Sequence, residues 1–316
     1  MSTPAGYDLI GDIHGHADEL RALLSALGYE EADGVYEHSE RQVVFLGDFI
    51  DRGPKIPEVL AIARSMVGSG KAIAVMGNHE FNALAFHTEN PQAPGVSLRP
   101  RINKNIRQHA ATISQLNDSE LSDALKWFRT LPMWAEIQGP SGSICRAVHA
   151  CWDESQMECI SNAKQQYGGL NSDFLADATN KGSKLFQAVE IVLKGKEISL
   201  PEGYHYYDKE GHKRTEIRAR WFERPSSGTQ YQDYVLQADP IECAIEMDES
   251  ALTSIEPYSP EAPPVLVGHY WLNADRPERL APNVACIDYS VAKGGYLCAY
   301  RWDGENELQD EKFVWF

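Results

Sequence analysis

Short apolar runs followed by amphipathic stretches dominate the first quarter of the chain. Residues 7–10, 43–46 and 73–76 are largely apolar and have the length of buried strands. Each run is followed by apolar positions at helical spacing, in 17–27, 54–67 and 80–86. A strand and a helix that alternate in this way predict a parallel sheet with right-handed crossover connections.

Further strands are expected on both sides of a long polar region. A helix is predicted at 118–128, and strands at 133–137, 144–148, 265–267, 284–287, 296–302 and 313–316. Residues 152–262 are more polar, with a helical piece at 183–193 and no clear linker at either end. We therefore expect one domain, 1–316, in which residues 152–262 form an α+β insertion that covers the site.

The composition is typical of a globular protein. The chain has 316 residues, of which 43% are hydrophobic, and no apolar run approaches the roughly 18 residues of a membrane span. Residues 1–6 lack the basic start and apolar stretch of a signal peptide, and the six cysteines form no CxxC pair. We expect a cytoplasmic protein with reduced thiols and no membrane partner.

The charge balance argues against one class of partner. The formal net charge is −17, from 29 Lys and Arg against 46 Asp and Glu. Because a duplex-binding domain normally presents a basic face, duplex nucleic acid is not an expected partner. An acidic chain can still bind a phosphorylated substrate where metal ions and a few arginines reverse the local field.

Metal-ligand side chains stand at the ends of five predicted strands. They are Asp12, His14, Asp48, Asn78, His149 and His269. Since the carboxyl ends of strands in an open α/β sheet meet at one edge, these residues predict a shared metal site. Mixed oxygen and imidazole ligands suit Mn, Fe, Zn or Ni rather than Ca or Mg.

Neighbouring residues would complete a site for hydrolysis at phosphorus. Asp48 can bridge two cations, and a pair about 3.5–4 Å apart can hold a hydroxide that attacks phosphorus. His79 can be the general acid that protonates the leaving oxygen, and Asp51 can fix its ring by a hydrogen bond. Arg52 offers a bidentate fork for phosphate oxygens.

These blocks resemble those of a known family. GDIHG (11–15), GDFIDRG (47–53) and GNHE (77–80), with the later His149 and Gly268-His269, resemble the pattern of calcineurin-like metallophosphoesterases. The DRG that ends the second block resembles the motif of the phosphoprotein phosphatase-like branch of this family. That branch contains Ser/Thr phosphatases, bacterial relatives and symmetrical diadenosine tetraphosphatases. The resemblance covers residues 7–150 and 263–302, and the insertion resembles nothing known to us.

The resemblance implies a fold and a set of roles. The implied fold is a four-layer β-sandwich of two mixed sheets flanked by helices, with the site at the strand ends. Asp12, His14 and Asp48 would hold one divalent metal ion, and Asp48, Asn78, His149 and His269 the other. His79 with Asp51 would be the acid pair and Arg52 a phosphate clamp. Manganese is the expected metal, with iron, zinc or nickel as alternatives.

The sequence departs from the family pattern at two points. The family has His-Gly-Gly at the fourth block, where this chain has His149-Ala150. The family also has a second phosphate-binding arginine between the last two blocks. Arg214, Arg218 and Arg220 all qualify by position, and we favour Arg220, so that Arg52, Asn78 and Arg220 are the expected substrate contacts.

Three functions remain open at this stage. The first is an enzyme, a dinuclear metal-dependent phosphatase that acts on a phosphoprotein or a small phosphorylated molecule. The second is a symmetrical dinucleoside polyphosphate hydrolase, in which the basic stretch 209–224 would form a trough for several phosphates. The third, a non-catalytic metal-binding scaffold, is disfavoured because His79 and every expected ligand are present.

Overall fold

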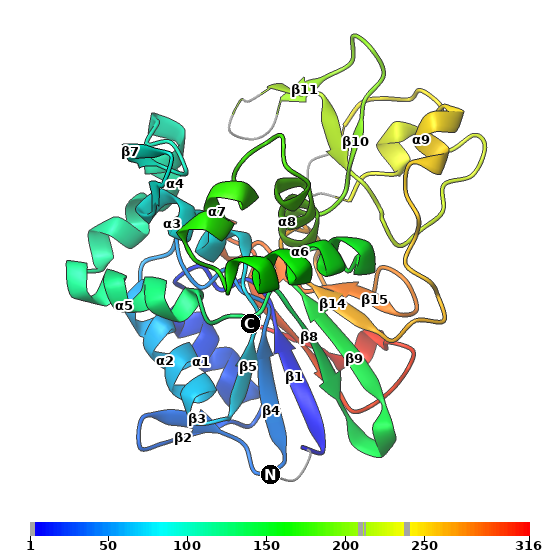
Figure 1. Cartoon of the computed structure of the whole chain (residues 1–316). Helices are drawn as coiled ribbons and strands as arrows, with labels where there is room; N and C mark the ends of the chain where they lie inside the picture. Colours follow the sequence, from blue (N-terminus) through cyan, green and yellow to red (C-terminus); the bar gives the residue numbers. More distant parts are fainter. Residues whose placement is uncertain (1–3, 208–210, 212, 237–240) are drawn as a thin grey trace.

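Two β-sheets form the centre of the molecule (Figure 1). The computed structural model describes residues 4–207, 211, 213–236 and 241–316. The first sheet has the order β16-β17-β1-β4-β5, with β18 paired to β17, and the second has the order β15-β14-β9-β8. The strands of the first sheet are β1 (Gly6–Ile10), β4 (Arg41–Phe45), β5 (Ala72–Ala74), β16 (Asp288–Tyr289), β17 (Tyr296–Trp302) and β18 (Phe313–Trp315). Those of the second are β8 (Trp134–Gln138), β9 (Ile144–Val148), β14 (Val265–Val267) and β15 (Val284–Cys286).

The predicted strand–helix repeat is confirmed in the first sheet. β1 pairs in parallel with β4, and β4 in parallel with β5. The helices α1 (Ala17–Ala26), α2 (Ile56–Gly68) and α3 (Asn78–His87) follow these three strands in order. A short hairpin of β2 (Glu30–Ala32) and β3 (Val35–Glu37) between α1 and β4 was not predicted. The three strands therefore end at the same edge of the sheet.

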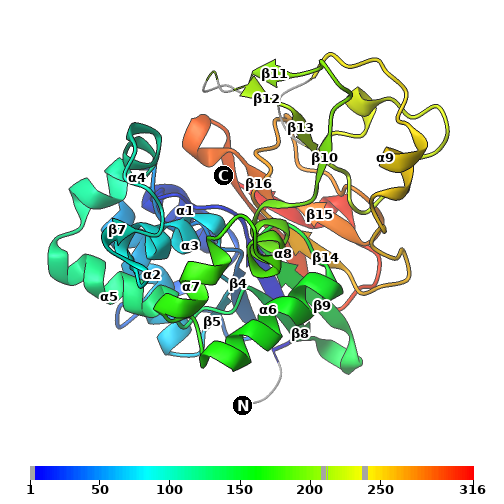
Figure 2. The same ribbon diagram turned by 45° about the horizontal axis from the view of Figure 1, so that its top comes forward.

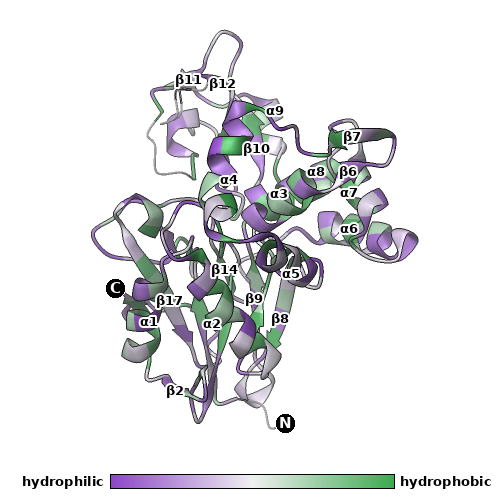
Figure 3. Ribbon diagram, turned by 90° about the vertical axis from the view of Figure 1, so that its left-hand side faces the viewer, coloured by the Kyte–Doolittle hydropathy of each residue, from purple (hydrophilic) through white to green (hydrophobic). Residues whose placement is uncertain are grey.

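Both faces of the central strands are buried, which explains their unbroken apolar runs. Leu9 and Val44 pack with Ala147 and Leu266 of the second sheet in a core between the two sheets. Their sequence neighbours Ile10 and Val43 lie in the other large core, with residues of α1 and α2. Figure 3 shows the strands as hydrophobic ribbons and the surrounding helices as mixed. The arrangement in four layers stays a prediction, because it also requires a layer of helices outside the second sheet.

A helical region follows α3. It contains β6 (Glu89–Asn90), β7 (Ala93–Ser97), α4 (Asn103–Gln115) and α5 (Asp118–Phe128). The predicted bounds of α5 are confirmed, and Asn117 explains its start because its side chain accepts from the backbone N–H groups of Ser119 and Glu120. The helix α4 was not predicted.

The predicted insertion contains helices and small two-stranded sheets. Its elements are α6 (Glu154–Tyr167), α7 (Ser172–Ala178), α8 (Lys184–Lys194), β10 (Glu197–Ser199), β11 (Tyr206–Tyr207), β12 (Lys213–Arg214), β13 (Glu216–Arg218) and α9 (Glu249–Thr253). Short 3₁₀ turns lie at Pro140–Gly142, Tyr231–Asp233, Val291–Lys293 and Asp310–Lys312. Figure 2 shows α8 near the ends of β9 and β14, and the backbone N–H of Ala150 donates to Val192 of α8. In the described ranges no helix has the length and apolar character needed to cross a membrane.

A buried carboxylate ties the first sheet together. Asp8 in β1 is fully buried and accepts hydrogen bonds from Nε of Arg41 at 3.0 Å and from Nε of Arg301 at 3.0 Å. The hydroxyl of Tyr29 donates a further bond at 3.0 Å. Because Arg41 belongs to β4 and Arg301 to β17, one side chain connects three neighbouring strands.

We expect Asp8→Asn to lower the free energy of unfolding by about 3 kcal/mol, because it leaves two arginines without their buried counter-charge. Urea unfolding followed by circular dichroism measures this loss. Asp18→Asn is the matched control, since Asp18 is also paired with two cations, Lys55 and Arg21, but lies on the surface. An equal effect of the two substitutions would contradict the structural role given to Asp8.

Candidate metal centre

The structure brings all six predicted ligand residues to the ends of the two sheets. Asp12 and His14 follow β1, Asp48 follows β4, and Asn78 opens α3 after β5. His149 follows β9 and His269 follows β14, from the second sheet. All are buried except His269, which is partly exposed. Their convergence from both sheets follows from the parallel pairing of the strands that carry them.

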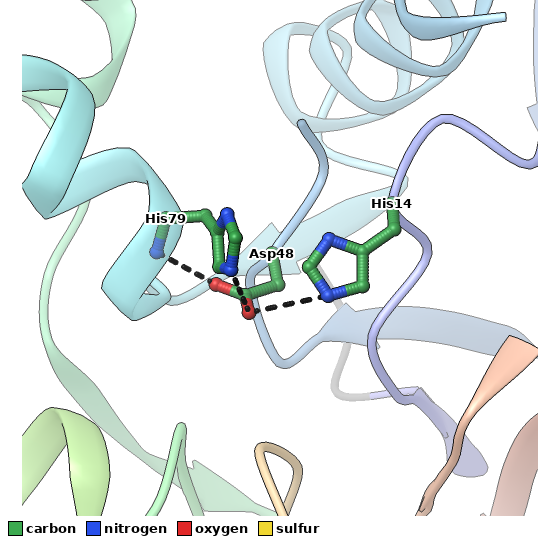
Figure 4. A group of neighbouring side chains, drawn as sticks. All are labelled: His14, Asp48 and His79. Carbon is green, nitrogen blue, oxygen red and sulfur yellow. Dashed lines mark hydrogen bonds and ion pairs between the residues drawn. The ribbon is translucent and has the colours of Figure 1, made fainter. Parts of the chain in front are cut away.

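The carboxylate of Asp48 lies at the centre of this group. Oδ2 of Asp48 is 3.5 Å from Nε2 of His14, and Oδ1 is 3.5 Å from Nε2 of His149. Figure 4 shows His14 and His79 on either side of this carboxylate. The backbone N–H of His79 donates to Oδ1 at 2.9 Å, which helps to hold the carboxylate in place.

The ring of His14 is arranged as a metal ligand. Its Nδ1 donates to the carbonyl oxygen of Ile50 at 2.8 Å, so in the neutral ring Nε2 carries a lone pair. This Nε2 is buried and has no hydrogen-bond partner among the described residues. Burial and the nearby His79 lower the pKa of His14 to about 3. A neutral nitrogen therefore faces the oxygen of Asp48, an arrangement that a cation between them would satisfy.

The opposite side of Asp48 repeats this arrangement. His149 donates through Nδ1 to the carbonyl oxygen of Leu46 at 2.8 Å, and its Nε2 lies 3.0 Å from Oδ1 of Asn78. The same Asn78 oxygen is 2.7 Å from Nδ1 of His269. Burial alone would lower the pKa of His149, but Asp48 and Asp12 raise it to about 10. A proton thus occupies Nε2 where a cation would replace it.

Asp12 completes the group on this side. Both of its carboxylate oxygens accept from the backbone N–H of His269 at 3.2 Å. One ligand atom each from Asp12, Asp48 and His149 lie within 4.8 Å of one another. A second such trio consists of His14, Asp48 and His79. The residues therefore fit the binding of metal on both sides of Asp48, and proximity alone also allows His79 as a ligand.

The backbone at the site adopts an uncommon conformation. In the described ranges nine non-glycine residues have positive φ, and six of them belong to the site or its rim. They are His14, Asp48, Asp51, Arg52, His269 and Trp271, with φ of 46°, 52°, 68°, 68°, 74° and 53°. Such conformations cost free energy and persist only where the surrounding contacts impose them.

Glu80 supplies part of that constraint. One of its carboxylate oxygens accepts from the backbone N–H groups of Asp48 at 2.8 Å and Gly77 at 2.9 Å, and the other from that of Phe49 at 2.9 Å. A Cβ at Gly77 would collide with the carboxylate of Asp48, which explains the glycine. Glu80 joins the second and third blocks. Sequence analysis placed it in the GNHE block without assigning it this role.

The predicted His79–Asp51 contact is present. Nδ1 of His79 lies 2.6 Å from Oδ2 of Asp51, whose other oxygen accepts from Nδ1 of His109 at 2.8 Å and from Oγ1 of Thr112 at 2.5 Å. Burial would raise the pKa of Asp51, but the hydrogen bonds from His109 and His79 lower it overall. The carboxylate is therefore held ionised beside the His79 ring.

Two members of this network, His109 and Thr112, were missed in the sequence. Both lie on α4, at positions three residues apart that share one face of a helix. Nε2 of His109 contacts Nε2 of His87 at 3.0 Å, which extends the network to α3. The available signal was this i, i+3 spacing, but it becomes visible only once α4 is recognised as a helix.

The predicted arginines lie in different environments. The guanidinium of Arg52 stacks 4.0 Å from the ring centroid of Trp271, and Nζ of Lys293 lies 3.7 Å from the same ring. Arg220 pairs with Glu223 at 2.8 Å. Arg218 pairs with Glu197 at 2.8 Å, and its charge, after burial and His149, helps to lower the pKa of His269. Arg214 is exposed, and Lys209 of the basic stretch lies outside the described residues.

Comparison with known proteins supports the interpretation of these motifs. The asymmetrical bis(5'-nucleosyl)-tetraphosphatase PrpE of Bacillus velezensis is 35% identical over 123 residues, which cover 39% of this chain and 46% of that protein. The symmetrical bis(5'-nucleosyl)-tetraphosphatase of Hamiltonella defensa is 43% identical over 127 residues, which cover 40% of this chain and 38% of that protein. The chain thus spans about half or less of the length of these curated relatives.

A solved structure aligns with most of the chain at low sequence identity. The cold-active protein-tyrosine phosphatase of a psychrophilic Shewanella aligns with 98% of this chain and 81% of its own, at 17% identity and a TM-score of 0.48. The sequence profile described as calcineurin-like phosphoesterase matches residues 7–225, well over half of the chain. These residues contain the first four motif blocks, whose side chains converge around Asp48. This chain belongs to the calcineurin-like phosphoesterase family.

Proposed function

We propose that this protein is a dinuclear metal-dependent phosphoester hydrolase that acts on a phosphorylated protein or small molecule. The observation that carries this proposal is the position of the Asp48 carboxylate, 3.5 Å from a ring nitrogen of His14 on one side and of His149 on the other. Two buried ligand sets that share one carboxylate suit a pair of divalent cations. Family membership supports a requirement for divalent metal ions.

The two ligand sets divide at Asp48. We propose Asp12, His14 and Asp48 for one cation, and Asp48, Asn78, His149 and His269 for the other. Manganese is our proposal for both, because mixed oxygen and imidazole ligands suit it. When bound, such ions supply Lewis-acid charge neutralisation at phosphorus. The six cysteines, all free thiols, support the proposed cytoplasmic location.

His79 is the proposed general acid. The carboxylate of Asp51, 2.6 Å from Nδ1, fixes the ring by a hydrogen bond, which leaves Nε2 to deliver a proton to the leaving oxygen. Oγ1 of Thr112 and Nδ1 of His109 donate to the other oxygen of Asp51, so three side chains fix the orientation of the His79 ring. In this arrangement Nε2 of His79 can deliver the proton without a change of rotamer.

Arginine side chains would bind the phosphoryl oxygens. Arg52 follows Asp51 directly, and its stacking on Trp271 limits the freedom of its guanidinium. For the second arginine we propose Arg218 in place of the earlier candidate Arg220. Both arginines are paired with a carboxylate at 2.8 Å, Arg218 with Glu197 and Arg220 with Glu223. Arg218 is favoured because its charge acts on the proposed ligand residue His269.

A dinucleoside polyphosphate hydrolase is the second candidate. Its support comes from the two relatives described above, both of which are named as bis(5'-nucleosyl)-tetraphosphatases. The same residues would act on a phosphoanhydride, because charge neutralisation at phosphorus is common to both reactions. A non-catalytic scaffold has no such support, since the expected ligands and His79 come together.

Hydrolysis of p-nitrophenyl phosphate by the manganese-loaded protein tests the proposal that this protein is a phosphoester hydrolase. Absence of turnover in protein that has bound metal would overturn the proposal.

Asp48→Asn should lose most of the bound metal and at least about a hundredfold in turnover, because the shared anionic ligand becomes neutral. Metal per chain is measured by inductively coupled plasma mass spectrometry after dialysis against manganese and buffer. Asp33→Asn, in the exposed turn between β2 and β3, is the control and should bind metal as the unmodified chain does. Full metal content in Asp48→Asn would remove Asp48 from the centre.

His79→Asn should keep its metal and lose at least about a hundredfold in kcat for a phosphoserine peptide, whose leaving oxygen needs a proton. The loss should be much smaller for p-nitrophenyl phosphate, whose leaving group is a weak base. His38→Asn serves as the control, since His38 packs against Tyr29 away from the centre. Loss of metal in His79→Asn would instead identify His79 as a ligand, and unchanged rates would exclude it from the reaction.

A further inference from the structure

One indole ring at the rim of the metal centre gathers two positive charges. The guanidinium carbon of Arg52 lies 4.0 Å from the ring centroid of Trp271, and Nζ of Lys293 lies 3.7 Å from the same centroid. We call these three residues the rim trio. They come from distant parts of the chain, so only the fold brings them together. Like charges held this close repel each other, whereas an anion beside them would be attracted by both.

A buried carboxylate fixes the two loops that carry Trp271 and Lys293. Asp288 in β16 is 2% exposed, and its Oδ2 accepts from the backbone N–H of Trp271 at 2.8 Å. Its Oδ1 accepts from the backbone N–H of Ser290 at 3.0 Å, and the carbonyl oxygen of Ser290 accepts from that of Lys293 at 2.8 Å. Asp288 thereby joins the loop after β14 to the turn after β16. This shared anchor brings Lys293 to the indole.

The backbone at this rim has an uncommon conformation. Arg52, Trp271 and Ser290 have left-handed φ of 68°, 53° and 59°. The backbone N–H groups of the last two are those that donate to Asp288. Since such conformations cost free energy and persist only where surrounding contacts impose them, the fold determines where the indole lies. A ring fixed in this way can align a cation that stacks on it.

The rim trio adjoins the proposed ligand residues. Burial lowers the pKa of His14 to about 3, and the charge of Arg52 contributes to that decrease. Trp271 lies two residues after His269, whose backbone N–H donates to both carboxylate oxygens of Asp12 at 3.2 Å. The two cations on the indole therefore lie beside the proposed metal centre.

We propose that Lys293 is a further substrate-binding residue, and that Trp271 positions Lys293 and Arg52 around one phosphoryl group. This inference rests on the proposed function and adds two residues to it. Arg52 would supply bidentate hydrogen bonds through its planar fork. Lys293 would supply a second positive charge as a compact ammonium group on a flexible side chain. A charge that attracts the phosphoryl group equally before and during hydrolysis contributes to KM rather than to kcat.

Lys293→Gln tests the second charge. In the manganese-loaded protein it should raise KM for p-nitrophenyl phosphate about fivefold or more and change kcat little, and Lys293→Arg should keep most of the affinity. The position is exposed, so the substitution carries no risk to folding. Lys126→Gln, an exposed cation on α5 paired with Asp123, is the matched control and should leave KM unchanged. An unchanged KM in Lys293→Gln would overturn the inference.

A double-mutant cycle with Arg52 tests the role of Trp271. Trp271→Leu should lower kcat/KM for p-nitrophenyl phosphate about tenfold or more, because Arg52 loses its alignment. Trp271→Phe, which keeps an aromatic ring, should retain most of the activity. In a chain that already carries Arg52→Gln, Trp271→Leu should cause a much smaller further loss. Losses that add in full would show that Trp271 does not act through Arg52, and would overturn the inference.

A binding measurement separates this inference from the proposed function. Calorimetric titration with inorganic phosphate is carried out at about pH 8, where the ion has two negative charges. Lys293→Gln and Trp271→Leu should each weaken binding to the manganese-loaded protein about fivefold or more. Absence of turnover with phosphate still bound would overturn the proposed function, while the titration still decides on the rim trio. Absence of phosphate binding to the unmodified protein, or unchanged affinity in either variant, would overturn the inference.

Discussion

The buried carboxylate of Asp48 faces nitrogen atoms that cannot both donate to it. The Nδ1 atoms of His14 and His149 donate to the carbonyl oxygens of Ile50 and Leu46, so the Nε2 atoms of both rings face Asp48, each at 3.5 Å. Such an arrangement of acceptors is costly away from water, and a proton on His149 relieves only one side. Cations on both sides of Asp48 would satisfy all of these side chains. We therefore expect the site to be most stable with metal bound.

Several other contacts keep the side chains around Asp48 in this arrangement. The left-handed backbone at His14, Asp48 and His269, three of the proposed ligand residues, carries a conformational cost. Glu80 offsets part of that cost, since its carboxylate accepts three backbone N–H groups of the second and third blocks. Asp51 likewise holds the ring of the proposed acid, His79, in place. His109 and Thr112 of α4 in turn hold Asp51 by hydrogen bonds.

The convergence of the proposed ligand residues could be predicted from sequence because three of the strands are parallel and buried on both faces. Their apolar runs are unbroken, and each ends abruptly in an Asp, His or Asn at the same sheet edge. The helix α4 could not be found in this way. It exposes Ile106 and Ile113 and buries mainly polar residues such as His109 and Thr112, so its apolar spacing is misleading. The choice among the arginines also depended on the fold, because only the folded chain shows that the charge of Arg218 acts on His269.

The account depends most directly on two cations sharing Asp48. A crystal structure of the protein grown with manganese, with anomalous scattering recorded near the manganese absorption edge, would locate them. We predict two anomalous peaks, one on the His14 side and one on the His149 side of Asp48, with His79 outside both coordination spheres. A single peak, or a peak coordinated by His79 in place of Asp48, would contradict the account.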